Sequence, residues 1–383
     1  MNFNAQIEID LNKLKYNIEI LKNAYNDYSI VIANLKNNAF GMGGGIVDTL
    51  VKNGVNYLYV STLQEALDIR KINTTVPILV NYEILDEYIY DAVANNITIT
   101  ISNLSNLEKI NEFKLKDKLN IHLLIDNGSN KIGLKSKEEV EKARIIIENN
   151  KYLNLEGVYT ELTTYGILDE DYYQEVNTFF KCISLLNDEG LIVHLNEPIM
   201  YHKKHNLVNG IRFDLALLGI EENIDDNVLS NMKIKSIERK YKDLAFPDIE
   251  LNVIFAIKAK IINVNRARKG DLIGKSFICR ENMNIAILPI GHKDGITKAI
   301  GNVLINGKIS RIIADEVDYL VVEAPFDVVA GEEVDIISYD TDIYDIIGLL
   351  KTNRYYLMSV LNSNLERTYI NKEVGDNVLW AKK

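Results

Sequence analysis

The sequence is poor in cysteine and in net positive charge, and both shortages exclude classes of protein. Its two cysteines, Cys182 and Cys279, are too few for a disulfide framework and form no metal-type pair. The formal net charge is −11, whereas binding a phosphate backbone needs clustered Lys and Arg, so we expect no nucleic-acid partner.

Long apolar runs are also missing. No run reaches the length of a membrane span, and the N-terminus lacks a basic segment followed by an apolar one. We therefore expect a cytoplasmic protein in a reducing environment, without membrane contact. The histidines His202 and His205 have an i,i+3 spacing, but neither a carboxylate pattern nor a cysteine lies nearby. A solvated loop explains them better, and we expect no metal site.

Short apolar runs alternate with helical patterns over the first part of the chain. The expected strands there are 7–11, 29–33, 57–61, 77–81, 97–101, 121–126, 157–160, 192–196 and 213–217. Alternation at this spacing predicts a parallel (β/α)8 barrel. Beyond this part, β-rich segments are separated by turns such as Asn306-Gly307, which is typical of a mainly-β domain. We predict a barrel over 1–235 and a C-terminal β domain over 236–383.

A lysine stands where such a barrel would carry catalytic groups. Lys36 follows the apolar run 29–33 and precedes a glycine-rich turn. The C-terminal ends of barrel strands carry the active site. An ammonium group that is desolvated there can lose its proton and act as a Schiff-base nucleophile. On spacing alone, a solvated loop lysine is the alternative.

Three segments together resemble the alanine racemase family. Residues 36–43 read Lys-Asn-Asn-Ala-Phe-Gly-Met-Gly, similar to the family's Lys-Ala-Asn-Ala-Tyr-Gly-His-Gly. Residues 289–295 resemble its Pro-Ile-Gly-Tyr-Ala-Asp-Gly, and 7–11 with Asn17-Ile18 look like its first strand and helix. The resemblance spans nearly the whole chain. It implies an amino-acid racemase that uses pyridoxal 5′-phosphate (PLP). It also implies a homodimer, in which the C-terminal domain of the second subunit completes each site.

The resemblance assigns roles to several matching positions. Lys36 would carry PLP as a Schiff base and remove the α-proton on one face of the amino acid. Arg212 aligns with an arginine that hydrogen-bonds the pyridine nitrogen, and Tyr355 with a tyrosine that contacts the phosphate. We also expect Asn196 to contact the cofactor. As alternatives, Arg212 would pair with an acid inside the barrel, and Tyr355 would be a packed surface tyrosine.

Other positions depart from the family pattern. Ile273 stands, in the best alignment, where the family has the tyrosine that acts as the second base, and isoleucine has no proton to exchange. Lys131 replaces an arginine that contacts the cofactor's phenolic oxygen, and Leu124 replaces the lysine whose carbamate orients that arginine. Ile313 and Ala314 stand in the place of a substrate-side pair of cysteine and methionine, and Phe40 replaces the signature tyrosine.

Three acids fall in the expected cofactor pocket. Glu197 replaces a serine and Asp214 a glycine of the phosphate cup, and Glu161 replaces a histidine near the ring. A carboxylate about 4 Å from a phosphate oxygen costs roughly 4 kcal/mol at an effective dielectric of 20. Either these side chains point away from the cofactor, or they face Lys36, Lys131 and Arg212 in a charge-paired pocket. Such a pocket would be cofactor-free, or would bind a small zwitterion or amine directly.

Two further residues are weaker candidates for the missing base. His292 replaces a tyrosine at the substrate entrance, where an imidazole could donate or accept a proton, and Tyr165 follows a predicted strand end. Each is more often an ordinary residue of the barrel mouth.

The leading hypothesis is an amino-acid racemase of the alanine racemase type. Lys36, Lys131 and His292 are its candidate catalytic residues, and a small amino acid or amine is its ligand. The competing hypothesis is a PLP-independent or non-catalytic homologue that acts as a binding or regulatory protein. A third retains PLP and uses one base for a different reaction at Cα.

Overall fold

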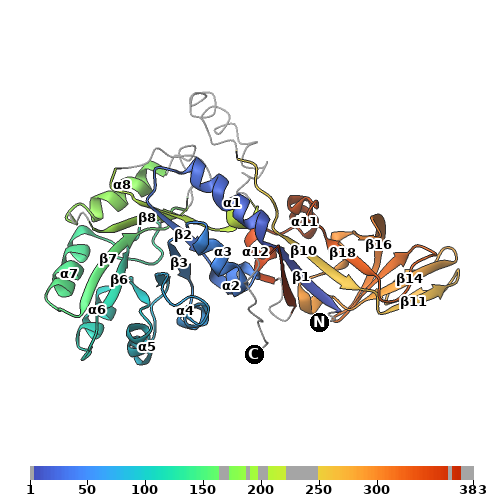
Figure 1. The fold of residues 1–383 in the computed structure, drawn as a ribbon, viewed down its shortest axis with the longest axis horizontal. Helices are drawn as coiled ribbons and strands as arrows, with labels where there is room; N and C mark the ends of the chain where they lie inside the picture. The colour runs from blue at the N-terminus through green and yellow to red at the C-terminus, as the bar shows by residue number, and fades with distance from the viewer. Residues whose placement is uncertain are drawn as a thin grey trace, which may run out of the picture.

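The computed structural model describes residues 4–163, 172–186, 190–196, 206–220, 249–360 and 365–371. Glu197, Tyr165, His202, His205 and the expected domain boundary at 235/236 lie outside these residues. The molecule is elongated, with a β/α barrel at one end and a β domain at the other (Figure 1). Helices α1 (Leu11–Ala24) and α12 (Arg354–Val360) lie where the two meet.

The first part of the chain forms a closed parallel barrel, which confirms the predicted fold. Its strands, in order around the barrel, are β2 (Ile30–Asn34), β3 (Tyr57–Val60), β4 (Ile78–Val80), β5 (Thr98–Ile101), β6 (Leu119–Leu124), β7 (Leu153–Tyr159), β8 (Ile192–Asn196) and β9 (Gly210–Phe213). β9 pairs with β2 and closes the ring.

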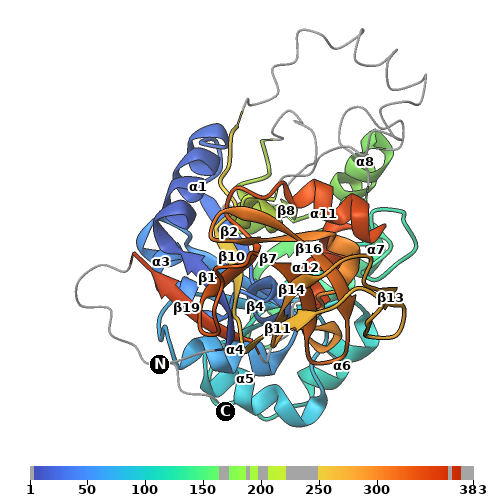
Figure 2. The same cartoon turned by 90° about the vertical axis from the view of Figure 1, so that its right-hand side faces the viewer.

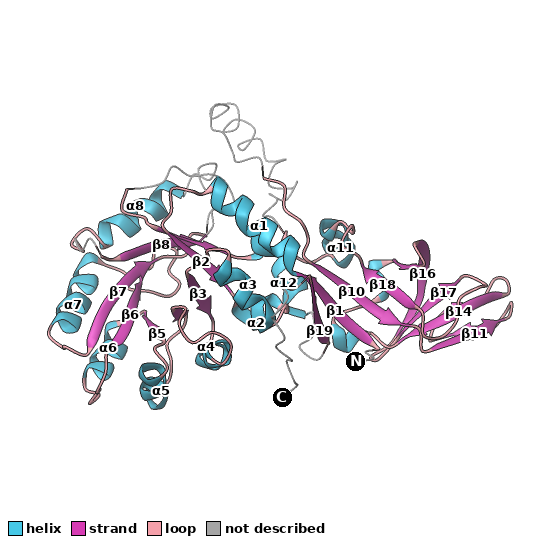
Figure 3. Cartoon of the chain, in the orientation of Figure 1, coloured by secondary structure: helices cyan, strands magenta, loops and turns pink. Residues whose placement is uncertain are grey.

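Helices surround the barrel strands (Figure 3). Besides α1, the described ones are α2 (Lys36–Phe40), η1 (Gly44–Ile46), α3 (Val47–Lys52), α4 (Leu63–Arg70), η2 (Asp86–Tyr88), α5 (Ile89–Ala94), α6 (Leu104–Asn111), α7 (Lys137–Glu148), α8 (Tyr172–Cys182) and η4 (Leu215–Leu218). Among the described residues, no helix combines the length and apolar character needed to cross a membrane.

The interior of the barrel holds a small cluster of its own, separate from the main core. It consists of Ile32, Tyr57, Tyr59, Leu79, Leu124 and Tyr159, each 2% exposed or less. Leu124, which we expect to stand in the place of the family's lysine, therefore fills the inside of the barrel. The tyrosines bring hydroxyl groups into this apolar space, and a buried hydroxyl needs a partner. We therefore expect polar partners for these hydroxyl groups inside the barrel.

The second part of the chain forms the C-terminal mainly-β domain, which stands in front of the barrel in Figure 2. A nine-stranded sheet runs in the order β11 (Asn263–Ala267), β14 (Met283–Leu288), β17 (Leu320–Ala324), β16 (Lys308–Asp315), β15 (Asn302–Ile305), β18 (Glu333–Ile337), β10 (Phe255–Lys260), β1 (Ala5–Asp10) and β19 (Glu366–Ile370). A small hairpin and further helices complete the domain: β12 (Leu272–Ile273), β13 (Phe277–Ile278), η5 (His292–Asp294), η6 (Lys298–Ile300) and α11 (Ile343–Leu350).

Two expected strands differ in the structure. The first strand, β1, lies in the C-terminal sheet, where Ile7 faces Ile257 of β10 and Arg367 of β19. The expected strand 213–217 is wrong, because β9 ends at Phe213 and the chain turns into the short helix η4. The turn falls at Asp214, with φ −101° and ψ −116°, and the four residues of η4 are then all buried.

A buried amide holds α1 to the segments at the junction. Asn17 is fully buried, and its Nδ2 donates to the carbonyl oxygens of Leu217 at 3.1 Å and Asn252 at 2.8 Å. Its Oδ1 accepts from the peptide N–H of Asn252 at 2.8 Å. One side chain therefore ties α1 to η4 and to the chain that enters the C-terminal sheet.

Asn17→Ala should lower the free energy of unfolding by about 2–3 kcal/mol, because it leaves buried polar groups without partners. Denaturant unfolding measures this change. Asn12→Ala, at an exposed position of the same helix, is the matched control and should cost about 0.5 kcal/mol or less. Equal losses for the two variants would contradict the structural role given to Asn17.

Candidate functional site

The segment after β2 holds a left-handed turn. Residues Asn37 to Phe40 have φ between 51° and 55°, and the N–H of Gly41 donates to the carbonyl of Asn37 at 3.0 Å. Left-handed backbone costs roughly 1–2 kcal/mol per residue, although asparagine tolerates it. Ala39 and Phe40 lack that tolerance. Backbone strain of this kind persists where the surroundings enforce it, often at functional sites. Here it positions Lys36.

Contacts from both domains hold this turn in place. Glu65 of α4 accepts from the N–H of Asn38 at 3.1 Å. From β19, Arg367 Nε donates to the carbonyl of Gly41 at 2.9 Å, and the Tyr369 hydroxyl donates to the carbonyl of Met42 at 2.8 Å. The same tyrosine explains one glycine of the turn, since a Cβ at Gly45 would lie 2.3 Å from Tyr369 Cζ.

Lys36 lies in a desolvated setting at the barrel mouth. Its Nζ is 3.7 Å from Glu161 Oε1 and 4.7 Å from the centroid of the Tyr59 ring. Burial lowers the pKa of Lys36, although Glu161 and Asp214 oppose the shift. The lysine is therefore more easily deprotonated than a solvated one, as a nucleophile or base requires.

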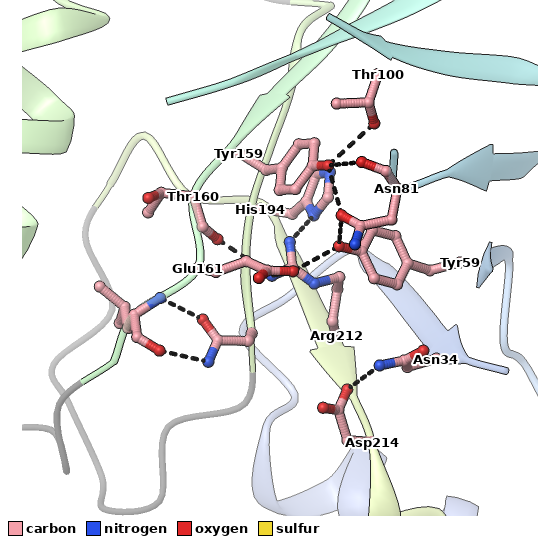
Figure 4. Close-up of polar contacts among 12 residues, drawn as sticks. Asn34, Tyr59, Asn81, Thr100, Tyr159, Thr160, Glu161, His194, Arg212 and Asp214 are labelled. Carbon is pink, nitrogen blue, oxygen red and sulfur yellow. Dashed lines mark hydrogen bonds and ion pairs between the residues drawn. The ribbon is translucent and has the colours of Figure 1, made fainter. Parts of the chain in front are cut away.

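Arg212 is the largest fully buried side chain of the described residues, with 1% exposure. Its Nη2 donates to the carbonyl of Thr160 at 3.1 Å and lies 3.9 Å from Glu161 Oε1. The guanidinium carbon sits 4.8 Å from the ring centroid of Tyr59 and 5.0 Å from that of Tyr159 (Figure 4). Two aromatic faces and a carboxylate thus stabilise this cation inside the barrel.

A chain of polar groups extends from Arg212 into the barrel. Arg212 Nη1 donates to His194 Nδ1 at 2.9 Å, because arginine has no acceptor. His194 Nε2 must then carry the hydrogen toward His122 Nδ1, 3.0 Å away. His122 Nε2 in turn faces Glu156 Oε2 at 3.3 Å.

The two histidines in this series of polar groups, His122 and His194, are neutral at pH 7. Burial lowers the pKa of His122 and lowers that of His194 well below its ordinary value, and the Arg212 charge adds to the effect at His194. Glu156 at the far end accepts from the Tyr57 hydroxyl at 2.6 Å and from Thr98 Oγ1 at 2.9 Å. The orientation of Arg212 is therefore fixed by a series of polar contacts that crosses the barrel interior.

Glu161 acts as the counter-charge of the site. It accepts from the Tyr59 hydroxyl at 2.6 Å. Burial raises its pKa, but the nearby charges of Arg212 and Lys36 outweigh burial, so the net shift is downward and the carboxylate stays ionised. Lys131, an exposed residue, adds to this lowering. Glu161 therefore faces the cations Lys36 and Arg212 at the barrel mouth.

A small cleft opens beside these residues, lined by Asn196, Asp214, Leu215, Ala216, Ile220, Arg354 and Tyr355. Asp214 Oδ1 accepts from Asn34 Nδ2 at 2.9 Å, and Tyr355 donates to Asp214 Oδ2 at 3.4 Å. The Tyr355 ring lies 6.3 Å from that of Phe40. Asn196, expected to contact the cofactor, and Tyr355, expected to contact its phosphate, therefore share one cleft with Asp214.

The remaining expected site residues lie elsewhere in this chain. Ile273 and Ala314 are buried in the same small cluster of the C-terminal domain. His292 is in that domain as well, where its Nε2 lies 2.9 Å from Asp315 Oδ2. No described group of three or more His, Cys, Asp or Glu residues could hold a metal ion.

Sequence reasoning missed the polar residues inside the barrel. Tyr59, His122 and Glu156 come from three different strands, and no local motif connects them. The available signal was the period of two along each strand, which places Tyr57 and Tyr59, or His122 and Leu124, on one face. Polar residues on the inward face of a barrel strand indicate a buried network.

Comparisons with known proteins agree with this architecture. The family model described as "Alanine racemase, N-terminal domain" matches residues 9–220, and "Alanine racemase, C-terminal domain" matches 254–369. Alanine racemase 1 of Bacillus subtilis (strain 168) is 26% identical over 375 residues, covering 95% of this chain and 92% of the relative. Alanine racemase of Borreliella burgdorferi (strain ZS7) is 28% identical over 385 residues, covering 97% and 98%.

Solved structures show the same fold. The chain is similar to an alanine racemase of Clostridium difficile 630, with a TM-score of 0.84, 25% identity, and coverage of 97% of this chain and 96% of that one. A histidine racemase from Leuconostoc mesenteroides subsp. sake NBRC 102480 has the same TM-score of 0.84 at 22% identity, with coverage of 96% and 98%. At 22% identity, the similarity to the histidine racemase shows a shared fold and no more.

The barrel, its C-terminal sheet and the lysine at the mouth define a racemase-type architecture. The chain belongs to the alanine racemase family. This confirms the family expected from the signature around Lys36 and, at the level of the family, the assignment as an isomerase.

The neutral histidines predict a pH dependence of stability. Their pKa values are lowered in the folded protein, so the unfolded chain binds protons first as the pH falls. The stability that the two neutral histidines contribute is fully present above about pH 6.5. Below that pH the free energy of unfolding falls by up to about 1.4 kcal/mol per pH unit for each histidine. His194→Asn should be less stable than the wild type at about pH 8 but should lose less on acidification to about pH 5. Denaturant unfolding across this range measures how the free energy of unfolding changes with pH in each protein. Equal slopes for the wild type and His194→Asn would contradict a neutral His194 in the folded protein.

Proposed function

We propose that the protein is a PLP-dependent amino-acid racemase that interconverts the L- and D-forms of a small amino acid. The observation that carries this proposal is the desolvated Lys36, held by a strained turn beside Glu161 and the buried Arg212 in a member of the alanine racemase family. Family membership alone would leave the chemistry open, because several family positions are substituted here.

The residues present fit the cofactor. Lys36 would hold its aldehyde carbon, and Arg212 would donate to its pyridine nitrogen. Arginine does not give up its proton, so that nitrogen would accept a hydrogen bond without becoming protonated. Tyr355 and Asn196 line a cleft next to Lys36 that would take the phosphate. When bound, PLP supplies an electron sink that acidifies the α-proton of an amino acid.

Lys36 would exchange a proton at Nζ on one face of the amino acid. Glu161 Oε1, 3.7 Å from that nitrogen, stabilises the ammonium form after proton uptake. The buried surroundings exclude water and strengthen this pairing. The same carboxylate lies near Arg212, so it balances both cations of the barrel mouth.

The proton on the opposite face needs a second group, because Ile273 cannot supply one. We propose that the protein works as a homodimer and that His292 of a second copy fills this role. Its imidazole is half exposed and is oriented by Asp315, with Nε2 and Oδ2 2.9 Å apart. A carboxylate that fixes one ring nitrogen leaves the other available for proton transfer. Lys131 is the alternative within the same chain.

A cofactor-free binding protein is the second candidate function. Asp214 favours it, because a carboxylate lines the cleft expected to take a phosphate. In that case Lys36, Glu161 and Arg212 would bind a small zwitterion directly. A one-base reaction at Cα is a third possibility and would follow if no second proton donor acts. The three candidate functions use the same barrel mouth. They differ in the ligand that it binds or in the reaction at Cα.

The decisive assay is incubation with PLP and an L-amino acid in heavy water. Alanine and histidine are the first substrates to test, since both occur in the names of similar proteins. We expect the D-form to accumulate with deuterium at Cα, as measured by chiral chromatography and mass spectrometry. Lys36→Ala should slow this by roughly a thousandfold.

Lys71→Ala removes an exposed lysine that pairs with Asp68, and it should leave the rate unchanged. Deuterium exchange without formation of the D-amino acid would favour the one-base reaction. The absence of any exchange with a full set of amino acids would contradict both reactions at Cα and favour the binding protein.

A further inference from the structure

One cation and one anion line the cleft beside Lys36, and they come from different parts of the chain. Asp214 follows β9 of the barrel, whereas Arg354 begins α12 after the C-terminal sheet. They are the charged side chains among the described residues that line this cleft. Arg354 is a residue to which neither the sequence signatures nor the proposed chemistry gave a role.

Aromatic contacts hold Arg354 at the mouth. Its guanidinium carbon lies 4.8 Å from the centroid of the Tyr355 ring, and its Nη2 is 3.5 Å from the Tyr355 hydroxyl. That ring lies 6.3 Å from the ring of Phe40, which belongs to the left-handed turn after Lys36. The cation is therefore connected to the segment that positions the lysine.

The charge of Asp214 makes a neighbouring cation necessary for an anionic ligand. A carboxylate close to a phosphate repels it. Asn34 and Tyr355 hydrogen-bond both carboxylate oxygens but do not remove the charge. A guanidinium offers several donors in a planar fork that matches two phosphate oxygens. Arg354 can supply both the charge and the geometry.

We propose that Arg354 binds the phosphate group of PLP and offsets the repulsion from Asp214. This inference rests on the proposed function, which places the cofactor at Lys36. It makes Arg354 the residue that selects a phosphorylated aldehyde over the unphosphorylated one. The role is one of binding and specificity, and proton transfer at Cα does not involve it.

The test compares PLP with pyridoxal, which lacks the phosphate. Each is titrated into the purified full-length protein, and binding is followed by the absorbance of the bound chromophore. Arg354→Gln should weaken PLP binding at least about tenfold, because charge-assisted hydrogen bonds are lost, and should leave pyridoxal binding unchanged. Arg354→Lys retains the charge but lacks the planar fork of donors. Its PLP affinity should lie between those of the wild type and Arg354→Gln.

Arg144→Gln is the matched control, because this arginine pairs with Glu141 and Glu148 on the outer helix α7. It should change neither affinity. If the wild type binds PLP but Arg354→Gln has no effect, or weakens both aldehydes equally, the role of Arg354 is overturned and the proposed function stands. If the wild type binds neither aldehyde, the proposed function fails and this inference fails with it.

Discussion

The burial of the Arg212 guanidinium is the constraint on which the site depends. A cation that is 1% exposed inside a barrel costs several kcal/mol unless its charge and donors are satisfied. The chain satisfies them with groups from several strands: the rings of Tyr59 and Tyr159, the carbonyl of Thr160, and His194. Each partner in turn restricts its neighbours, so Arg212 is held by polar groups that lie among the apolar side chains of the barrel interior.

This constraint also explains the acid next to the lysine. Two cations at one desolvated mouth would repel each other, and Arg212 itself lowers the pKa of Lys36, less strongly than burial does. Glu161 lies within 4 Å of both and stays ionised because of them. From the sequence alone this acid looked unfavourable for a cofactor pocket. In the structure it balances the charges, and among the described residues the repulsion of a phosphate comes from Asp214.

Much of the architecture could be predicted from the sequence. The alternation of apolar runs with helical patterns identified the barrel, and the strand 192–196 has the bounds expected. The signature around residue 36 placed the lysine at a strand end, where the structure has it. These features depend on local patterns, and local patterns are visible in a single sequence.

Features that depend on distant partners were not predictable in this way. β1 has the apolar pattern of any buried strand, and only its pairing with β10 and β19 places it in the C-terminal sheet. The series from Arg212 through His194 and His122 to Glu156 joins three strands, β9, β8 and β6, to a fourth, β7. Arg354 meets the cleft because α12 packs against the turn after Lys36, a contact that spans most of the chain length.

We propose that this buried network prepares Lys36 to hold PLP. The most direct measurement is to add PLP to the purified protein, reduce with borohydride, and map the modified peptide by mass spectrometry. If Lys36 holds PLP, a visible absorption band forms and disappears on reduction, and the adduct is on Lys36. No such band even at high PLP, or an adduct spread over surface lysines, would contradict it.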